Sequence, residues 1–178
     1  MSTLRSVFIG IGSNIDPQRH LASASGHIRA RWPSAVCSSV YRTAAQYETH
    51  QPDFLNAVCR IETRDAVPVI MEALRTIEDV EEKRKSTRYG PRTIDLDLLL
   101  YGEEIIPGRE EWLRAKQLHD DYSPELFVPH LRMDDRAFVI IPLAELAPSF
   151  SHPVTGVTIE ELVHKTAHQQ CERIDWLT

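Results

Sequence analysis

The chain has 178 residues, of which 42% are hydrophobic, and its formal net charge at pH 7 is −6. This composition predicts one domain over residues 1–178 with a hydrophobic core, and neither secretion nor membrane insertion is expected because no long apolar run is present. The acidic charge argues against broad binding to nucleic acids, although locally gathered cations could still hold an anionic ligand.

The chain contains three cysteines, Cys37, Cys59 and Cys171, and they are widely spaced with no C-x-x-C pair. This spacing is not typical of a disulfide framework or of a zinc site. We therefore expect buried thiols in a reducing cytoplasm.

Periodicity and turn residues predict alternating strands and helices along the chain. In chain order we expect a strand at 7–11, a helix that Asp16-Pro17 begins and Pro33 ends, strands at 36–41 and 54–63, a helix that Asp65 caps, a strand at 93–101, a strand at 138–143 and a helix at 159–168. Between them, residues 103–127 form a long excursion in which "EEWLRAKQL" could be a short helix. Helices interleaved with a mostly antiparallel sheet predict an α+β sandwich of ferredoxin-like type.

The strand at 93–101 carries two carboxylates on one face. Side chains alternate along a strand, so Ile94, Leu96, Leu98 and Leu100 should share an apolar face that packs under helices. Asp95 and Asp97 then lie side by side on the other face, with their Cβ atoms about 6–7 Å apart. Aspartate is disfavoured within strands, and two like charges this close repel unless a cation lies beside them. Carboxylates on a rigid element suit Mg²⁺, which usually takes one or two of them together with water and phosphate oxygens.

Positive charge precedes this strand. Five cationic side chains lie within residues 83–92: Lys83, Arg84, Lys85, Arg88 and Arg92. A solvated basic loop is one interpretation, but beside two aspartates such cations could bind the outer oxygens of a polyphosphate whose Mg²⁺ the aspartates hold. The spacing of Gly10 and Gly12 does not match a Walker A motif, so a glycine cradle for phosphate is not expected.

Five blocks of sequence resemble one enzyme family. In order they are "GIGSN" (10–14), "YRT" (41–43), "QPDFLNAV" (51–58), "RYGPRTIDLDLLLYG" (88–102) and "VPHLRMDDRAFVIIPLAELAP" (128–148). Together they resemble the 6-hydroxymethyl-7,8-dihydropterin pyrophosphokinases of folate biosynthesis. The resemblance implies a cytoplasmic enzyme that transfers pyrophosphate from ATP to the hydroxymethyl group of a reduced pterin and releases AMP, with two Mg²⁺ ions. It implies small-molecule substrates only, with no nucleic acid or membrane as partner, and a monomer is expected.

The resemblance also assigns roles to individual residues. Asp95 and Asp97 match the metal ligands, while Arg92, Lys83 and Arg84 are the catalytic candidates. The positions expected to contact ATP are Glu78, Arg84, Arg88, Arg92, Leu98, His130 and Arg136. Those expected to contact the pterin are Thr43, Ala44, Phe54, Asn56, Tyr89 and Phe138. Two aromatic faces and an amide that donates and accepts are what a flat heteroaromatic ring requires.

The chain departs from the family pattern in its basic loop. The family has G-R-x-R there, whereas this chain has "VEEKRKSTR", with Glu82 or Lys83 at the place of the first arginine. Lysine does not replace a bidentate arginine, so turnover is more in doubt than the fold. Two alternatives therefore stay open, a paralogue that acts on another alcohol and a silent protein that binds nucleotide or pterin. A D-x-D metal hydrolase is a third.

Overall fold

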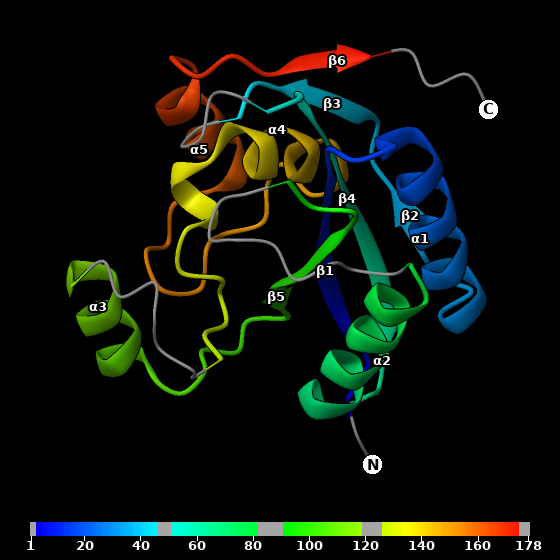
Figure 1. Cartoon of the computed structure of the whole chain (residues 1–178). Coiled ribbons are helices and arrows are strands. Elements are labelled where there is room, and N and C mark those ends of the chain that lie inside the picture. The colour runs from blue at the N-terminus through cyan, green and yellow to red at the C-terminus, as the bar shows by residue number, and fades with distance from the viewer. Residues whose placement is uncertain (1–2, 46–50, 82–90, 119–125, 175–178) are drawn as a thin grey trace.

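One antiparallel sheet organises the chain (Figure 1). The computed structural model describes residues 3–45, 51–81, 91–118 and 126–174. Within these ranges six strands pair in the order β5-β1-β4-β3-β6, and β2 pairs with β4. The strands are β1 (Arg5–Ser13), β2 (Val36–Cys37), β3 (Val40–Thr43), β4 (Phe54–Thr63), β5 (Asp95–Tyr101) and β6 (Glu172–Ile174). The order of the central strands confirms the predicted α+β, ferredoxin-like class.

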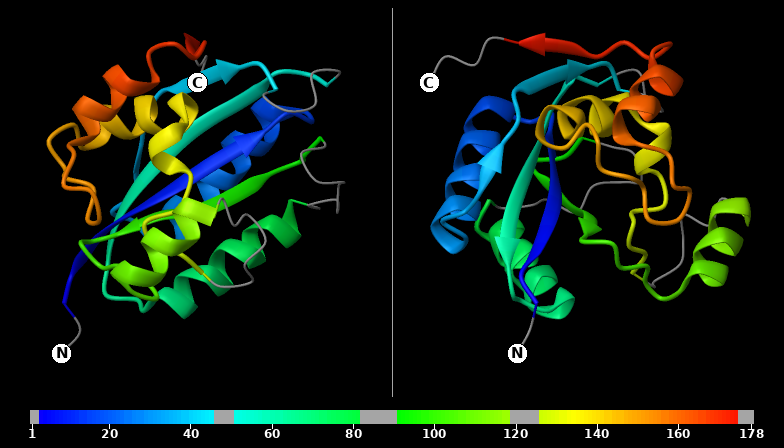
Figure 2. Two further views of the ribbon diagram at one scale, coloured as in Figure 1. Left: turned by 90° about the vertical axis from the view of Figure 1, so that its left-hand side faces the viewer. Right: turned by 180° about the vertical axis from the view of Figure 1, so that it is seen from behind.

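Helices cover both faces of this sheet (Figures 1 and 2). They are α1 (Pro17–Arg31), α2 (Val67–Val80), α3 (Arg109–Leu118), the 3₁₀ turn η1 (Met133–Asp135), α4 (Ala137–Leu146) and α5 (Ile159–Thr166). Helices α1 and α2 pack on one face, and α4 and α5 lie on the other. No helix in the described ranges combines the length and the apolar character that crossing a membrane requires.

The larger core lies between the sheet and helices α1 and α2. Alternate residues of β1, β4 and β5 point into it, including Ile9, Ile61 and Leu98, and they meet the apolar stripes of the two helices. Each fully buried Ile or Leu contributes about 1.5–3 kcal/mol, so this face supplies much of the stability. As a result the other face need not be fully covered.

The opposite face of the sheet is only partly covered. Helices α4 and α5 pack on Phe8, Val58 and Leu99 to form a second core. Leu100 joins this second core and not the first one, which corrects the predicted alternation. The reason is a shift of register between β1 and β5 at Phe8/Ile9, which places two successive leucines on one side. The end of this face nearest Asp95 and Asp97 remains open.

The predicted strand at 138–143 is wrong, because Ala137–Leu146 is the helix α4. The segment is rich in β-branched residues, which favours a strand locally. However, it is apolar on nearly every side, and a short run of this kind has no periodicity to separate a strand from a buried helix. Burial between the sheet and α5 decides for the helix.

Two smaller predictions also need correction. The strand expected at 36–41 is two strands, β2 and β3, with Ser38 bonding the backbone of β4 where they separate. Asp65 does not cap α2, whose N-cap is Ala66. The Asp65 carboxylate instead accepts hydrogen bonds from Arg31 at 2.8 Å and from the indole N–H of Trp32 at 2.9 Å, so Asp65 holds the end of α1.

The expectation of free thiols fails for two of the cysteines. Cys37 on β2 and Cys59 on β4 are directly paired residues of the sheet, with Cα atoms 4.0 Å apart, and they form a disulfide. Their separation of 22 residues gave no sign of this, because strand register brings them together. Cys171 remains a thiol, and burial raises its pKa to about 11.

A buried carboxylate joins the ends of α1 and α2. Glu81, just after α2, is only 6% exposed, and its carboxylate accepts from Ser23 and contacts His20 Nδ1 at 2.7 Å. His27 Nε2 lies 3.6 Å from the same group. Burial by itself would raise the pKa of Glu81, but the hydrogen bonds from Ser23 and His20 outweigh it and lower the pKa below its ordinary value.

Replacing this carboxylate should therefore change how stability depends on pH. A native pKa below the unfolded value of about 4.3 gives stability that is full above pH 4.3 and is lost as pH falls through the native pKa. We expect Glu81→Gln to lower the free energy of unfolding at pH 7 by about 1–3 kcal/mol, with a smaller difference from wild type below pH 4. Urea unfolding measures both values. Glu72→Gln, on the exposed side of α2, is the control, and an equal loss at every pH would contradict the prediction.

Candidate active site

Two glycines of the central strand β1 form the floor of an open cleft. Gly10 and Gly12 lie on β1, between β5 and β4. Opposite residues of antiparallel strands share a face, so Asp97 and Val58 flank Gly10, and Asp95 and Asn56 flank Gly12. A Cβ atom at Gly12 would lie 3.2 Å from Asn56 Oδ1, and one at Gly10 would lie 3.4 Å from Leu99. The two glycines therefore leave a hollow where the neighbouring strands carry polar side chains.

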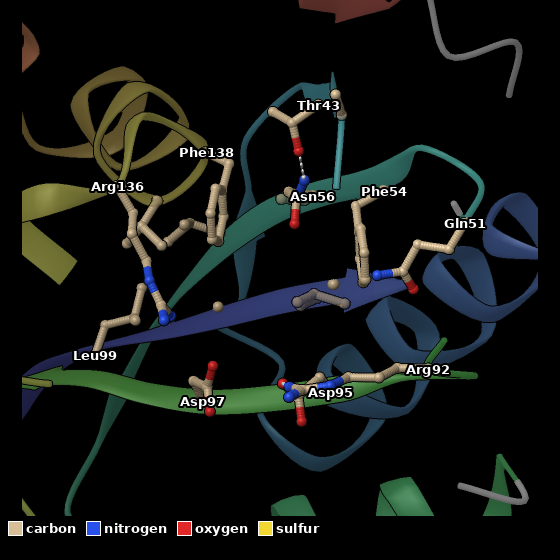
Figure 3. A pocket seen from close by; sticks show the side chains of 17 residues that line it. Thr43, Gln51, Phe54, Asn56, Arg92, Asp95, Asp97, Leu99, Arg136 and Phe138 are labelled. Atoms are coloured by element: carbon tan, nitrogen blue, oxygen red, sulfur yellow. Dashed lines mark hydrogen bonds and ion pairs between the residues drawn. The ribbon is translucent and has the colours of Figure 1, made fainter. Parts of the chain in front are cut away.

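The two aspartates form one wall of this cleft. Both line it from β5, which confirms that they share a face, as Figure 3 shows. The Asp95 carboxylate forms an ion pair with Arg92, a residue that also lines the cleft. In the described part of the chain, no group of three or more His, Cys, Asp or Glu side chains is placed to hold a metal ion. Two carboxylates without a third protein ligand match what Mg²⁺ takes when phosphate and water complete its shell.

Aromatic rings and an amide form the other wall. Phe54 and Asn56 project from β4, and Phe138 projects from the first turn of α4 (Figure 3). Asn56 Nδ2 donates to Thr43 Oγ1 at 3.0 Å, which fixes the orientation of the amide. The other N–H and the Oδ1 acceptor of this amide are therefore already oriented before any ligand binds. Thr43 and Ala44, two further predicted pterin contacts, also line the cleft.

The turn after β1 ties three segments together at one end of the cleft. The Asn14 side chain accepts from Arg92 N at 2.7 Å and donates to Gln51 Oε1 at 3.0 Å and to Pro52 O at 3.1 Å. Ser13 Oγ donates to Thr93 O at 2.5 Å. These contacts hold the start of β5 and the start of β4 against the end of β1. The "GSN" turn is therefore a buried junction that sets the position of Arg92.

Basic groups lie beside the aspartates. Arg136 lines the cleft, and its guanidinium carbon is 5.6 Å from the centre of the Phe138 ring. His130 is placed by its backbone N–H, which donates to Leu99 O at 2.9 Å. Its Nδ1 accepts from Arg132 N at 3.2 Å, so in the neutral ring the proton is on Nε2. Burial lowers the pKa of His130 to about 4, and the charge of Arg136 acts in the same direction.

Three predicted ATP contacts, Glu78, Leu98 and His130, are not among the residues that line the cleft. The Leu98 side chain points to the opposite face and packs in the larger core, so only its backbone is on offer to a ligand near β5. The Glu78 carboxylate accepts from Leu96 N at 2.8 Å and thereby joins α2 to β5. Lys83, Arg84, Arg88 and Tyr89 lie outside the described residues, and their roles stay predictions.

Sequence reasoning missed several residues that shape the cleft. In the sequence, Gly10 and Gly12 are considered only as phosphate-binding glycines, and no separate role is assigned to Asn14, which belongs to the "GIGSN" block. A signal for the glycines was present, because glycine inside a strand often marks a close approach by a ligand. Gln51 and Leu99, which also line the cleft, carried no comparable signal.

This arrangement suits the transfer of a phosphate-containing group. An aromatic-walled slot with one oriented amide binds a flat heteroaromatic molecule, and a carboxylate pair with arginines binds a polyphosphate and its metal. Both lie over the same glycine floor, so their ligands would meet in one cleft (Figure 3).

Comparison with known proteins agrees with this chemistry. Residues 8–148 match the family described as 7,8-dihydro-6-hydroxymethylpterin-pyrophosphokinase (HPPK). The chain is 32% identical over 174 residues to the 2-amino-4-hydroxy-6-hydroxymethyldihydropteridine pyrophosphokinase of Pseudomonas aeruginosa, which covers 96% of this chain and 98% of that protein. The protein of the same name from Haemophilus influenzae is 31% identical over 173 residues, covering 96% and 98% of the two chains.

A solved structure shares the fold. The wild-type HPPK-DHPS of Plasmodium falciparum superposes with a TM-score of 0.66 at 12% sequence identity, and the match covers 93% of this chain. This chain spans 45% of that longer protein. At this identity the likeness supports the architecture alone.

Proposed function

The chain belongs to the 7,8-dihydro-6-hydroxymethylpterin-pyrophosphokinase family, and we propose that the cleft over Gly10 and Gly12 is where it carries out the family's reaction. It is an ATP-dependent diphosphotransferase of folate biosynthesis, which transfers pyrophosphate to the hydroxymethyl group of 6-hydroxymethyl-7,8-dihydropterin and yields AMP. The observation that carries the assignment of the site is the placement of the carboxylate pair and the aromatic-amide slot in one cleft.

The pterin would occupy the slot between Phe54 and Phe138. Ring stacking on both faces orients the heterocycle and is worth about 0.5–1.5 kcal/mol per aromatic pair beyond simple burial. Because one N–H of the Asn56 amide is bonded to Thr43, its Oδ1 acceptor and its second N–H can bind a ring edge that both donates and accepts. The retained slot favours a pterin over another alcohol as the acceptor substrate.

Asp95 and Asp97 would hold Mg²⁺ together with the phosphates of ATP. The donors fit this ion, because they are hard oxygen ligands on a rigid strand beside a floor that has no side chains. When bound, Mg²⁺ ions neutralise the polyphosphate and orient it for attack; two are expected in this family. In this state Asp95 would exchange part of its contact with Arg92 for the metal.

The protein's own cations would place the triphosphate. Arg92 and Arg136 converge on the cleft, and His130 offers an Nε2–H donor while staying neutral at physiological pH. The hydroxymethyl oxygen would then form a bond to the β-phosphorus as the bond from this phosphorus to the α,β-bridging oxygen breaks. The electron pair leaves with AMP, and the hydroxyl proton is released. Catalysis of this kind rests on positioning and charge, which the strands supply.

Lys83, Arg84 and Arg88 would complete the cationic side from outside the described residues, and Tyr89, also outside them, would contact the pterin. We further propose that the enzyme acts in the cytoplasm as a monomer on small-molecule substrates. The acidic net charge of −6 accords with the absence of a nucleic acid partner.

Removing one carboxylate tests the metal site. We expect Asp97→Asn to lower kcat for AMP formation with MgATP and the pterin by about 10²-fold or more, because a ligand to the metal is lost where charge develops. Thermal unfolding should be nearly unchanged, since the side chain faces the open cleft. Asp79→Asn, on the exposed side of α2, is the matched control. Turnover close to wild type in Asp97→Asn would refute the assignment of the metal site.

The same assay separates the enzyme from its alternatives. Wild-type protein should form AMP only when the pterin is present. Tight binding of both ligands without AMP would favour a silent binding protein, and phosphate release without pterin would favour a hydrolase.

Filling the floor of the cleft tests the pterin slot. A Cβ atom at Gly12 would press on Asn56 Oδ1 at 3.2 Å and turn the amide away from its ligand. We expect Gly12→Ala to weaken pterin binding by about 5- to 100-fold, which corresponds to a lost buried hydrogen bond. Isothermal titration calorimetry measures this value. Gly26→Ala is the control, because a Cβ at Gly26 on α1 meets nothing within 4 Å, and unchanged pterin affinity in Gly12→Ala would contradict the role of Asn56.

A further inference from the structure

The excursion at 103–127 builds a small core of its own. Helix α3 contributes Trp112 and Ala115, and these pack on Phe127 and Val154. This cluster is separate from both cores of the sheet. The ribbon views show α3 standing away from the helices that cover the sheet (Figures 1 and 2). What α3 contacts is the segment that runs from Phe127 to Arg136 and the turn near His152. The helix therefore buries its apolar side against the irregular chain that enters the candidate active site.

Trp112 holds the residue before His130. Its side chain is 1% exposed, and its indole N–H donates to Pro129 O at 2.6 Å. The ring also packs edge-on against His152, with ring centres 5.4 Å apart. A buried indole N–H without an acceptor would cost about 1–3 kcal/mol, so this bond fixes the position of the Pro129 carbonyl relative to α3.

Lys116, one helical turn further on, holds the residues after His130. Its ammonium group donates to Leu131 O at 2.7 Å, to Asp134 at 2.6 Å and to Asp135 at 2.5 Å. All three donors of the group are therefore in use. Asp134 and Asp135 form η1, which leads directly into Arg136, the N-cap of α4.

These contacts flank the basic groups of the cleft on both sides. His130 lies between Pro129 and Leu131, and Arg136 follows Asp135. The backbone of this stretch is largely outside regular secondary structure, and one bond from His130 N to Leu99 O attaches it to β5. Besides its own turns and the burial of Val128 and Met133 in the two cores, the segment takes its position from the side chains that pack on it. Here two of those side chains come from α3.

We propose that α3 is a positioning element of the nucleotide subsite, in which Trp112 and Lys116 set the placement of His130 and Arg136 toward the phosphates of ATP. The inference rests on the proposed function of these two residues and deepens it. It assigns a role to the excursion that the family's shared motifs do not cover. Neither Trp112 nor Lys116 lines the cleft, so both act through the segment they hold.

The alternative is that α3 adds stability alone. A purely stabilising helix would affect both substrates equally, or neither, at temperatures where the protein is folded. A positioning helix should affect the nucleotide and spare the pterin, because Phe54, Asn56 and Thr43 are held by strands β3 and β4. The difference between the two affinities therefore separates the two roles.

The test uses the full chain with two substitutions that remove hydrogen-bond donors of α3 and leave a smaller or uncharged side chain in place. Lys116→Met removes the charge and its three hydrogen bonds, and Trp112→Phe removes the indole donor while an aromatic ring remains. Lys116→Arg should retain nucleotide affinity, because a guanidinium can reach the same oxygens. Lys165→Met, on the exposed side of α5, is the matched control. Calorimetry measures the Kd of a non-hydrolysable MgATP analogue and the Kd of the pterin, each well below the Tm of the variant.

We expect Lys116→Met and Trp112→Phe to weaken binding of the nucleotide analogue by about 3- to 30-fold, with pterin affinity within twofold of wild type. Lys116→Arg and Lys165→Met should bind both ligands like wild type. Unchanged nucleotide affinity in both variants would overturn the inference, and so would an equal loss for both ligands.

Measuring AMP formation separately distinguishes failure of the proposed reaction from failure of the proposed role of α3. If wild-type protein binds the analogue but forms no AMP, the catalytic assignment fails, and the two affinities still decide the role of α3. If wild-type protein does not bind the analogue, both proposals are overturned.

Discussion

The open cleft depends on one constraint. On the face that lines the cleft, the central strand β1 carries glycine at two successive positions between β5 and β4. A strand in this position must keep its backbone hydrogen bonds to both neighbours, so it cannot bend away to make room for a ligand. Gly10 and Gly12 make that room while the pairing continues on either side. Asp95, Asp97 and Asn56 then stand around a hollow, with positions set by register. No loop has to close for these three side chains to be in place.

The sheet can leave this hollow because its two faces do different work. One face is buried against α1 and α2 over nearly its whole length. The other is buried only under α4 and α5, where Phe8, Val58 and Leu99 form the second core. Polar groups are expensive to bury without partners, so the aspartates are tolerated at the uncovered end of the face. The ion pair of Arg92 with Asp95 and the bond from Asn56 to Thr43 lower that cost further.

The parts of this structure that could be predicted are those that local pattern determines. Alternation alone places Asp95 beside Asp97 and Phe54 beside Asn56, and both pairs line the cleft. The resemblance groups Phe138 with Phe54 and Asn56, and all three line the cleft. The pattern of its segment nevertheless predicts a strand where the structure has a helix, because an apolar run has no period that reveals a buried helix. The pairing of Cys37 with Cys59 and the junction at Asn14 depend on contacts between distant segments. The sequence of one chain does not encode such contacts in any visible period.

Under the proposed function the cleft has one half for the pterin and one for the nucleotide, and the two halves differ in how they are supported. The pterin side is built on β3, β4 and the first turn of α4. The nucleotide side draws on the segment from Pro129 to Arg136, which has little regular structure. Such a segment can be supported in more than one way, since any packing that holds its carbonyls will do. In this chain Trp112 and Lys116 bind the carbonyls of Pro129 and Leu131, on either side of His130. If α3 has the proposed role, this side of the cleft thus depends on support that a strand-built wall does not require.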